Sequence, residues 1–151
     1  MITTRQARIA ALTFAATAAL AFAGAGAAQA APPDSPAIPL NTGQETPSPT
    51  VGGAHGSFSY EIEGDMLCWE LEVTGLSSGA IAAHIHLGER NVAGGVVVPL
   101  AVEVGATSFE TEGCATPSPE VLAGIEADPK SYYVNVHTAT NMPGEVRGQL
   151  K

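Results

Sequence analysis

Two histidines lie one residue apart in the segment AAHIHL of a chain that contains four histidines. In a β-strand, side chains at positions i and i+2 point to the same face, so His84 and His86 would present two imidazole rings side by side. A third histidine, His137, lies in YYVNVHT, where the same alternation puts it on the face opposite the valines. Imidazole suits Cu and Zn, and three imidazoles leave a position open for a further ligand. The spacing therefore fits a metal site at His84, His86 and His137.

The same three histidines also fit a metal-free polar cluster. In that alternative, the ring nitrogens hydrogen-bond to backbone carbonyls or to the nearby Glu145 and Arg147. His55, in GGAHGSF, is expected to be an exposed imidazole just before the first clear strand. It would become a fourth ligand only if the fold brought the start of that strand near the His84 and His86 pair.

Glu145 and Arg147 alternate with apolar residues in EVRGQL and therefore share one face of a predicted strand. An acid and a base two residues apart on one face predict a local, structural ion pair. Gly144 and Gly148 in the same stretch indicate a close approach of another backbone.

The strands that must position these side chains are predicted from apolar residues that alternate with polar ones. A hairpin is expected over 56–73, with its turn at Glu63–Asp65 and with Ser, Cys and Glu residues on the face away from the core. Further strands are expected over 80–87, 95–102, 107–113, 131–138 and 145–151. In the first of these, Ala83, Ile85 and Leu87 are expected to face the core.

One short helix is expected in SPEVLAGIEADP, with Ser118 as N-cap, Pro119 in the first turn and Asp128–Pro129 as the stop. Short strands with regular turn signals and a single helix are typical of an all-β fold, an antiparallel sandwich or barrel.

Cys68 and Cys114 are the two cysteines of the chain. An even pair in an exported protein predicts a disulfide, and closing a loop of this length would contribute about 4 kcal/mol to stability. Because an oxidising compartment favours the bridge, a metal-binding role for either thiolate is not expected.

The first 30 residues resemble a secretory signal peptide. Arg5 and Arg8 form a basic start, an apolar run rich in Ala and Gly follows, and Ala28-Gln29-Ala30 offers a cleavage site for signal peptidase. The alternative is a retained N-terminal anchor, which the weak hydropathy of the run disfavours. We therefore expect a secreted or cell-envelope protein with no membrane span after cleavage.

Residues 31–52, rich in Pro, Ser and Thr, predict a mobile segment with one edge strand at Ile38–Leu40, ahead of a single domain over 53–151. After cleavage the chain would keep all 15 acidic residues and four of its six basic ones, a formal net charge of −11. Such a surface repels nucleic acid and anionic lipid and attracts cations. The chain has no Ser/His/Asp or Cys/His catalytic signature and no phosphate-binding loop.

The segments AAHIHLGERNVAGGVVVPL and YYVNVHTATNMPGEVRGQL, with LNTGQETPSP near the predicted mature start, resemble the CHRD family, the domain repeated in chordin and present singly in exported bacterial proteins. The resemblance covers residues 38–151. It implies an antiparallel Greek-key sandwich, similar to immunoglobulin domains or to Cu/Zn superoxide dismutase. The family's His-x-His and Asn-Val-His-Thr motifs fall on His84, His86 and His137, and the first is similar to a copper-binding pair of that dismutase.

Two features depart from these resemblances. His55 stands where the family usually carries a small or hydroxyl residue, and the two cysteines are not part of its motifs. Four histidines are also too few for a two-metal dismutase site.

The leading hypothesis is a non-catalytic binding protein that holds one copper ion, with zinc less favoured, through His84, His86 and His137. One alternative is a metal-free module that interacts with an extracellular or envelope protein, by analogy with chordin and growth factors. Another is a redox enzyme that uses copper alone. The sequence does not indicate an oligomeric state.

Overall fold

The structure, a computed structural model, describes residues 36–151 of the chain. This range contains one α-helix, α1 (Pro119–Ala127), and two 3₁₀ turns, η1 (Thr42–Gln44) and η2 (Pro129–Ser131). Its strands are β1 (Ile38–Asn41), β2 (His55–Glu63), β3 (Met66–Thr74), β4 (Ala80–Leu87), β5 (Val96–Leu100), β6 (Phe109–Ala115), β7 (Tyr132–Thr138) and β8 (Val146–Gln149). The predicted signal peptide, residues 1–30, lies outside the described residues.

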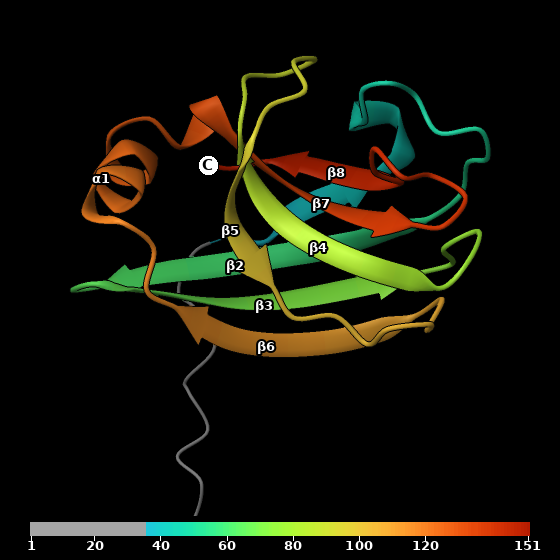
Figure 1. Cartoon of the computed structure of the whole chain (residues 1–151), viewed down its shortest axis with the longest axis horizontal. Coiled ribbons are helices and arrows are strands. Elements are labelled where there is room, and N and C mark those ends of the chain that lie inside the picture. The colour runs from blue at the N-terminus through green and yellow to red at the C-terminus, as the bar shows by residue number, and fades with distance from the viewer. Residues whose placement is uncertain (1–35) are drawn as a thin grey trace, which may run out of the picture. The chain divides into compact units, whose positions relative to one another are not determined.

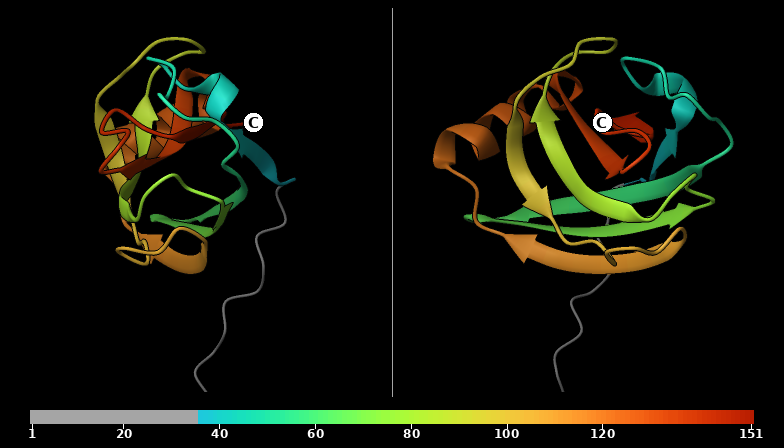
Figure 2. Two further views of the ribbon diagram at one scale, coloured as in Figure 1. Left: turned by 90° about the vertical axis from the view of Figure 1, so that its right-hand side faces the viewer. Right: turned by 45° about the vertical axis from the view of Figure 1, so that its right-hand side comes forward.

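All eight strands join antiparallel neighbours in the order β5-β4-β7-β8-β1-β2-β3-β6. The sheet folds into two layers, so that β4, β7 and β8 lie over β2, β3 and β6 (Figures 1 and 2). The two layers are joined where β8 meets β1 at the residue pair Asn41 and Arg147. The edge strands β5 and β6 approach each other on the opposite side. The predicted antiparallel all-β sandwich with one helix is confirmed.

The position of β1 corrects the prediction of an edge strand in a mobile segment. β1 lies in the middle of the sheet, between β8 and β2, and its Ile38 and Leu40 are buried. Pro39 suggested an edge because it has no N–H to donate. β1 pairs with β8 only through Asn41, however, so Pro39 does not interrupt that ladder. A Cβ atom at Gly148 would lie 2.7 Å from side-chain carbons of Ile38 and Leu40, which explains the glycine at this crossing.

The core lies between the two layers and follows the predicted alternation. Its largest fully buried apolar side chains come from β1 to β4, α1 and the C-terminal end: Ile38, Leu40, Phe58, Leu67, Leu71, Ile85, Ile125 and Leu150. Leu87 is an exception, because it was expected to face the core and is 50% exposed. It is the last residue of β4 and follows a shift of register between Ile85 and His86 in the pairing with β5.

The helix α1 begins and ends where the sequence predicts. The Ser118 side chain accepts a hydrogen bond from the Val121 N–H, and Asp128 is the C-cap. Leu122 and Ile125 are its buried residues. No helix in the described part of the chain combines the length and the apolar character that crossing a bilayer requires.

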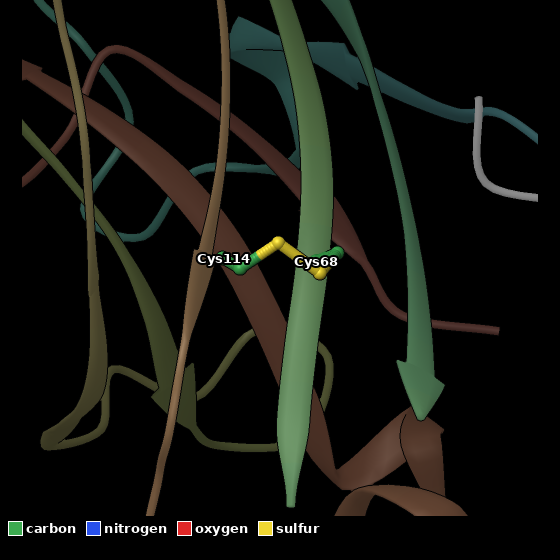
Figure 3. The surroundings of a disulfide bond; sticks show 2 residues. All are labelled: Cys68 and Cys114. Carbon is green, nitrogen blue, oxygen red and sulfur yellow. A yellow bond between two sulfur atoms is a disulfide. The ribbon is translucent and has the colours of Figure 1, made fainter. Parts of the chain in front are cut away.

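A disulfide links Cys68 on β3 to Cys114 on β6 (Figure 3). The two cysteines are direct partners in the register of these antiparallel strands. Cys114 is exposed and Cys68 is partly buried, because both point away from the core, as the alternation predicts. The bridge therefore ties β6, an edge strand, to its only neighbour in the sheet.

The double variant Cys68→Ala/Cys114→Ala should lower the free energy of unfolding by about 2–4 kcal/mol, since the unfolded chain regains the freedom that the cross-link removes. Equilibrium unfolding in urea measures the loss. Ser59→Ala, a change on the same outer face, is the matched control and should leave the midpoint within experimental error. An unchanged midpoint in the double variant would contradict a stabilising role for the bridge.

Candidate metal centre

The face of β4, β7 and β8 that points away from the core is polar but buried. All seven residues of β7 are buried, which requires cover on both faces of that strand. On the outer face, the exposed fraction is 7% for His86, 0% for Asn135, 9% for His137 and 1% for Arg147. A second interior layer therefore exists outside the sheet, and loops must supply its cover and its hydrogen-bond partners.

The segment between β4 and β5 forms part of this cover. The Arg147 guanidinium donates to the backbone oxygens of Val92 at 3.0 Å and Glu89 at 2.9 Å. It also lies over the Tyr133 ring, 3.4 Å from the ring centroid. The Tyr133 hydroxyl accepts from the Gly94 N–H at 3.1 Å. These contacts hold the segment against β7 and β8.

Beneath this cover, the structure brings together the three histidines that the sequence selects. His84, His86 and His137, called the histidine group below, each offer a nitrogen, and these nitrogens all lie within 4.8 Å of one another. His84 Nδ1 and His137 Nε2 are 3.0 Å apart. Metal–nitrogen bonds of about 2.0–2.1 Å place the nitrogens around one ion about 3–4 Å apart. The group therefore needs only a small contraction to bind one ion.

Two of these imidazoles are oriented by backbone carbonyls. His86 Nδ1 lies 2.9 Å from the Gly94 oxygen, and His137 Nδ1 lies 2.9 Å from the Met142 oxygen. A carbonyl oxygen only accepts, so each Nδ1 carries the hydrogen and each Nε2 keeps its lone pair. Protein ligands of metal ions are commonly oriented in this way, by a hydrogen bond from the second ring nitrogen.

His86 Nε2 is buried and has no hydrogen-bond partner among the described residues. The Asn135 side-chain oxygen is likewise buried and unsatisfied. A buried polar atom without a partner costs about 1–3 kcal/mol, and it is uncommon in a native protein. His86 Nε2, which lies next to two other imidazoles, is therefore the atom of the group whose lone pair a bound cation would satisfy.

The histidine group favours neutral rings. Burial, together with the neighbouring His137 and His86, lowers the pKa of His84 to about 4. Burial also lowers the pKa of His86 and of His137. The Gly94 and Met142 carbonyls act in the opposite direction, and so does the Asn135 side chain, which accepts from the His86 ring only when that ring is protonated. Neutral imidazole is the form that binds a metal ion, so the site is ready for a ligand at neutral pH.

The fourth histidine does not join the group. His55 is exposed at the start of β2, and its Nδ1 lies 3.2 Å from the Gly53 oxygen. The nitrogens that lie close together belong to His84, His86 and His137. The suggestion of His55 as a further ligand is therefore not supported, because β2 lies in the other layer of the sandwich.

The predicted ion pair between Glu145 and Arg147 is wrong. The Glu145 carboxylate accepts instead from the backbone N–H of Ser77, from the Ser77 and Thr138 hydroxyls and from the Asn141 amide. Burial alone would raise the pKa of Glu145, but these hydrogen bonds outweigh burial and lower it. Glu145 precedes the first residue of β8, and so the alternation along the strand does not extend to it.

The acidic residue whose charge acts on Arg147 is Glu45, which sequence reasoning missed. Glu45 is 4% exposed, and its carboxylate accepts from the Thr46 N–H at 2.9 Å and from the Asn135 amide at 3.3 Å. Burial raises its pKa, against those two bonds and the charge of Arg147. Gly144 has a φ of +141°, and a Cβ atom there would collide with a Glu45 carboxylate oxygen. The signal for Glu45 was its place in LNTGQETPSP, which the family resemblance includes.

The comparison with known families agrees with the motifs. The family model described as CHRD domain matches residues 37–150 of this chain. No curated protein and no solved structure matches this chain. The matched range begins at β1 and contains all three residues of the histidine group.

The lowered pKa values of the histidine group predict how the stability of the metal-free protein depends on pH. Each group titrates near 6.5 in the unfolded chain and lower in the folded one, so the unfolded state binds more protons as the pH falls below about 6.5. Stability is therefore complete above that pH and decreases between pH 6.5 and pH 4, by at most about 1.4 kcal/mol per pH unit for each histidine.

Urea unfolding from pH 7 to pH 5 should show a steeper loss for the wild type than for His84→Gln/His86→Gln/His137→Gln. His55→Gln is the control and should keep the slope of the wild type. Equal slopes in the wild type and the triple variant would show that burial does not depress these pKa values.

Proposed function

The chain belongs to the CHRD domain family, and we propose that it is a binding protein that holds one copper ion through His84, His86 and His137. The observation that carries this proposal is the buried Nε2 of His86, which has no hydrogen-bond partner and is adjacent to two further imidazoles. One cation would satisfy all three nitrogens.

Preorganisation supports the proposal. The Gly94 and Met142 carbonyls fix the tautomers of His86 and His137, and the His86 ring stacks on Tyr133 with an interplanar angle of 7°. Little side-chain freedom is left to lose when an ion binds, and this favours affinity. His84 is the adjustable member, because it is only partly buried and its Nδ1 contacts His137 Nε2, a bond that an ion would replace.

The donor set favours copper over other ions. The group consists of neutral imidazoles without a carboxylate or thiolate. Imidazole suits Cu, Zn, Fe and Ni, and at a given nitrogen site Cu²⁺ binds more tightly than the other divalent first-row ions. Zinc is the alternative ion. Calcium and magnesium, which prefer oxygen ligands, are not expected to compete.

A metal-free interaction module is the alternative, and one observation favours it. The contact between His84 Nδ1 and His137 Nε2 gives both atoms a partner without any ion. In that alternative, the histidines would serve stability and the function would lie in a surface that contacts another protein. The alternative leaves His86 Nε2 without a partner, and for this reason we place it second.

We propose further that the protein acts outside the cytoplasm, in the envelope or the medium. The disulfide between Cys68 and Cys114 supports this location, because such bridges persist in oxidising compartments. The basic start, the apolar run and Ala28-Gln29-Ala30 are the sequence features of export. Storage, delivery or sequestration of copper would each use a site that binds without turnover.

Purified wild-type protein should bind one equivalent of copper, and His84→Ala/His86→Ala/His137→Ala should bind none, because the variant lacks every nitrogen of the group. Titration calorimetry and elemental analysis measure the stoichiometry. His55→Ala is the matched control and should retain one equivalent. Far-UV circular dichroism and urea unfolding establish that the triple variant is folded.

Copper that persists in the folded triple variant, or is not bound by the wild type, would reject the copper proposal. A wild type that binds no metal, with a triple variant that is folded but less stable, would favour the metal-free module. Superoxide turnover by the copper-loaded protein would replace a binding role with a redox one.

The export proposal has its own measurement. Intact mass of the protein recovered from outside the cytoplasm should correspond to residues 31–151, since cleavage is expected after Ala30. Ala28→Arg/Ala30→Arg, which places large charged residues at the cleavage positions, should retain the full N-terminus. Protein found only inside the cell with residue 1 intact would reject export.

A further inference from the structure

The basic residues of the described chain gather at one place. Residues 36–151 contain four of them, Arg90, Lys130, Arg147 and Lys151. Three of the four line a single pocket of about 350 Å³, while Arg147 is buried beneath the segment between β4 and β5. In a chain with 15 acidic residues, this is a local reversal of charge. A pocket of this charge attracts anions that the rest of the surface repels.

The pocket also has an apolar floor. Its accessible apolar surface comes from the exposed Pro39 and from the aliphatic stems of the basic side chains, above Ile38 and Leu150, which are at most 2% exposed. Gln44 and Gln149 add polar groups. Apolar surface with a few converging polar groups, in a volume of this size, is typical of sites for small molecules.

Two of the three cations are available to a ligand. Among the described residues, the side chains of Arg90 and Lys130 make no hydrogen bond or ion pair, although both are exposed in an acidic protein. Lys151 Nζ donates to the Ala37 backbone oxygen at 3.1 Å, which holds it at the rim and leaves its other hydrogens free. Among the described residues, no Asp or Glu side chain forms an ion pair with any of the three basic side chains of the pocket.

Hydrogen bonds hold the walls in place. The Gln149 side-chain amide lies 2.7 Å from the backbone oxygens of both Gly88 and Lys130, which joins the two segments that carry Arg90 and Lys130. Gln44 Nε2 donates to the Pro39 backbone oxygen at 3.0 Å. The pocket is thus formed before a ligand arrives, and binding requires little ordering of the backbone.

We propose that this pocket binds a small organic anion, an apolar body that carries one carboxylate or phosphate group. The anionic head lies among Arg90, Lys130 and Lys151, and the apolar body lies against Pro39 and the aliphatic stems of the basic side chains. An inorganic anion would leave the apolar floor in water, and a neutral molecule would leave the cations without a partner. The histidine group lines no part of this pocket, so the inference does not depend on copper binding.

Titration calorimetry of the purified protein at low ionic strength tests the proposal with four probes: octanoate, octyl phosphate, inorganic phosphate and 1-octanol. Octanoate and octyl phosphate should bind at least about tenfold more tightly than inorganic phosphate and octanol, because only they use both the charge and the floor. Comparison of the first two shows which head group is preferred. Raising the salt from 0.05 to 0.5 M should weaken their binding.

Arg90→Gln/Lys130→Gln/Lys151→Gln should weaken the binding of octanoate by about tenfold or more, as three charge contacts are lost. Gln44→Glu, which adds a negative charge to the pocket, should weaken it in the same direction. Thr107→Glu is the matched control, since it adds the same charge at an exposed residue outside the pocket. Copper binding should not change in any of these variants.

Three results would overturn the proposal. Octanol or inorganic phosphate could bind as tightly as octanoate, which would mean that the pocket recognises only apolar matter or only charge. The triple variant, folded by circular dichroism, could bind octanoate as tightly as the wild type. Finally, all four probes could fail to bind at millimolar concentration.

Discussion

The buried guanidinium of Arg147 is the interaction on which the outer layer of this protein depends. A buried charge is tolerated only when its donors are satisfied and an opposite charge lies near. The Val92 and Glu89 carbonyls, the Tyr133 ring and the charge of Glu45 meet these needs together. These partners lie on three segments that are distant in sequence: the one between β4 and β5, strand β7, and the segment after η1 that carries Glu45. The arginine therefore specifies how two of these segments close over one face of the sheet.

The closure of these segments over the sheet also sets the geometry of the histidine group. The segment that Arg147 holds also supplies the Gly94 carbonyl, which sets the tautomer of His86. The Met142 carbonyl, from the turn before β8, does the same for His137. The result is a buried, polar layer in which nearly every group has a partner, and in which the atoms left without one include His86 Nε2. The site is thus a product of loop packing as much as of strand register.

Much of this architecture could be predicted from the sequence. Period-two alternation is sufficient to find β2 to β4 and β7, and Ser118 and Asp128–Pro129 mark the ends of α1. The same alternation, with the family resemblance, selected His84, His86 and His137. It failed for Glu145 because a strand periodicity carries no information beyond the strand's end. It also failed for β1 and Glu45, since four residues between turn signals resemble an edge, and only tertiary contacts show that Ile38 and Leu40 fill the centre.

The junction of β1 with β8 has a consequence for the order of folding. Asn41 and Arg147, the pair that joins the two layers, stand near opposite ends of the described chain. Every other strand lies between them in sequence, so this contact has one of the longest loops to close in the molecule. A chain that emerges N-terminus first can form the β2–β3 hairpin early, but its sheet stays divided until β8 is available. Completion of the fold is therefore a late event, because the two layers cannot join until the last strand of the described residues has formed.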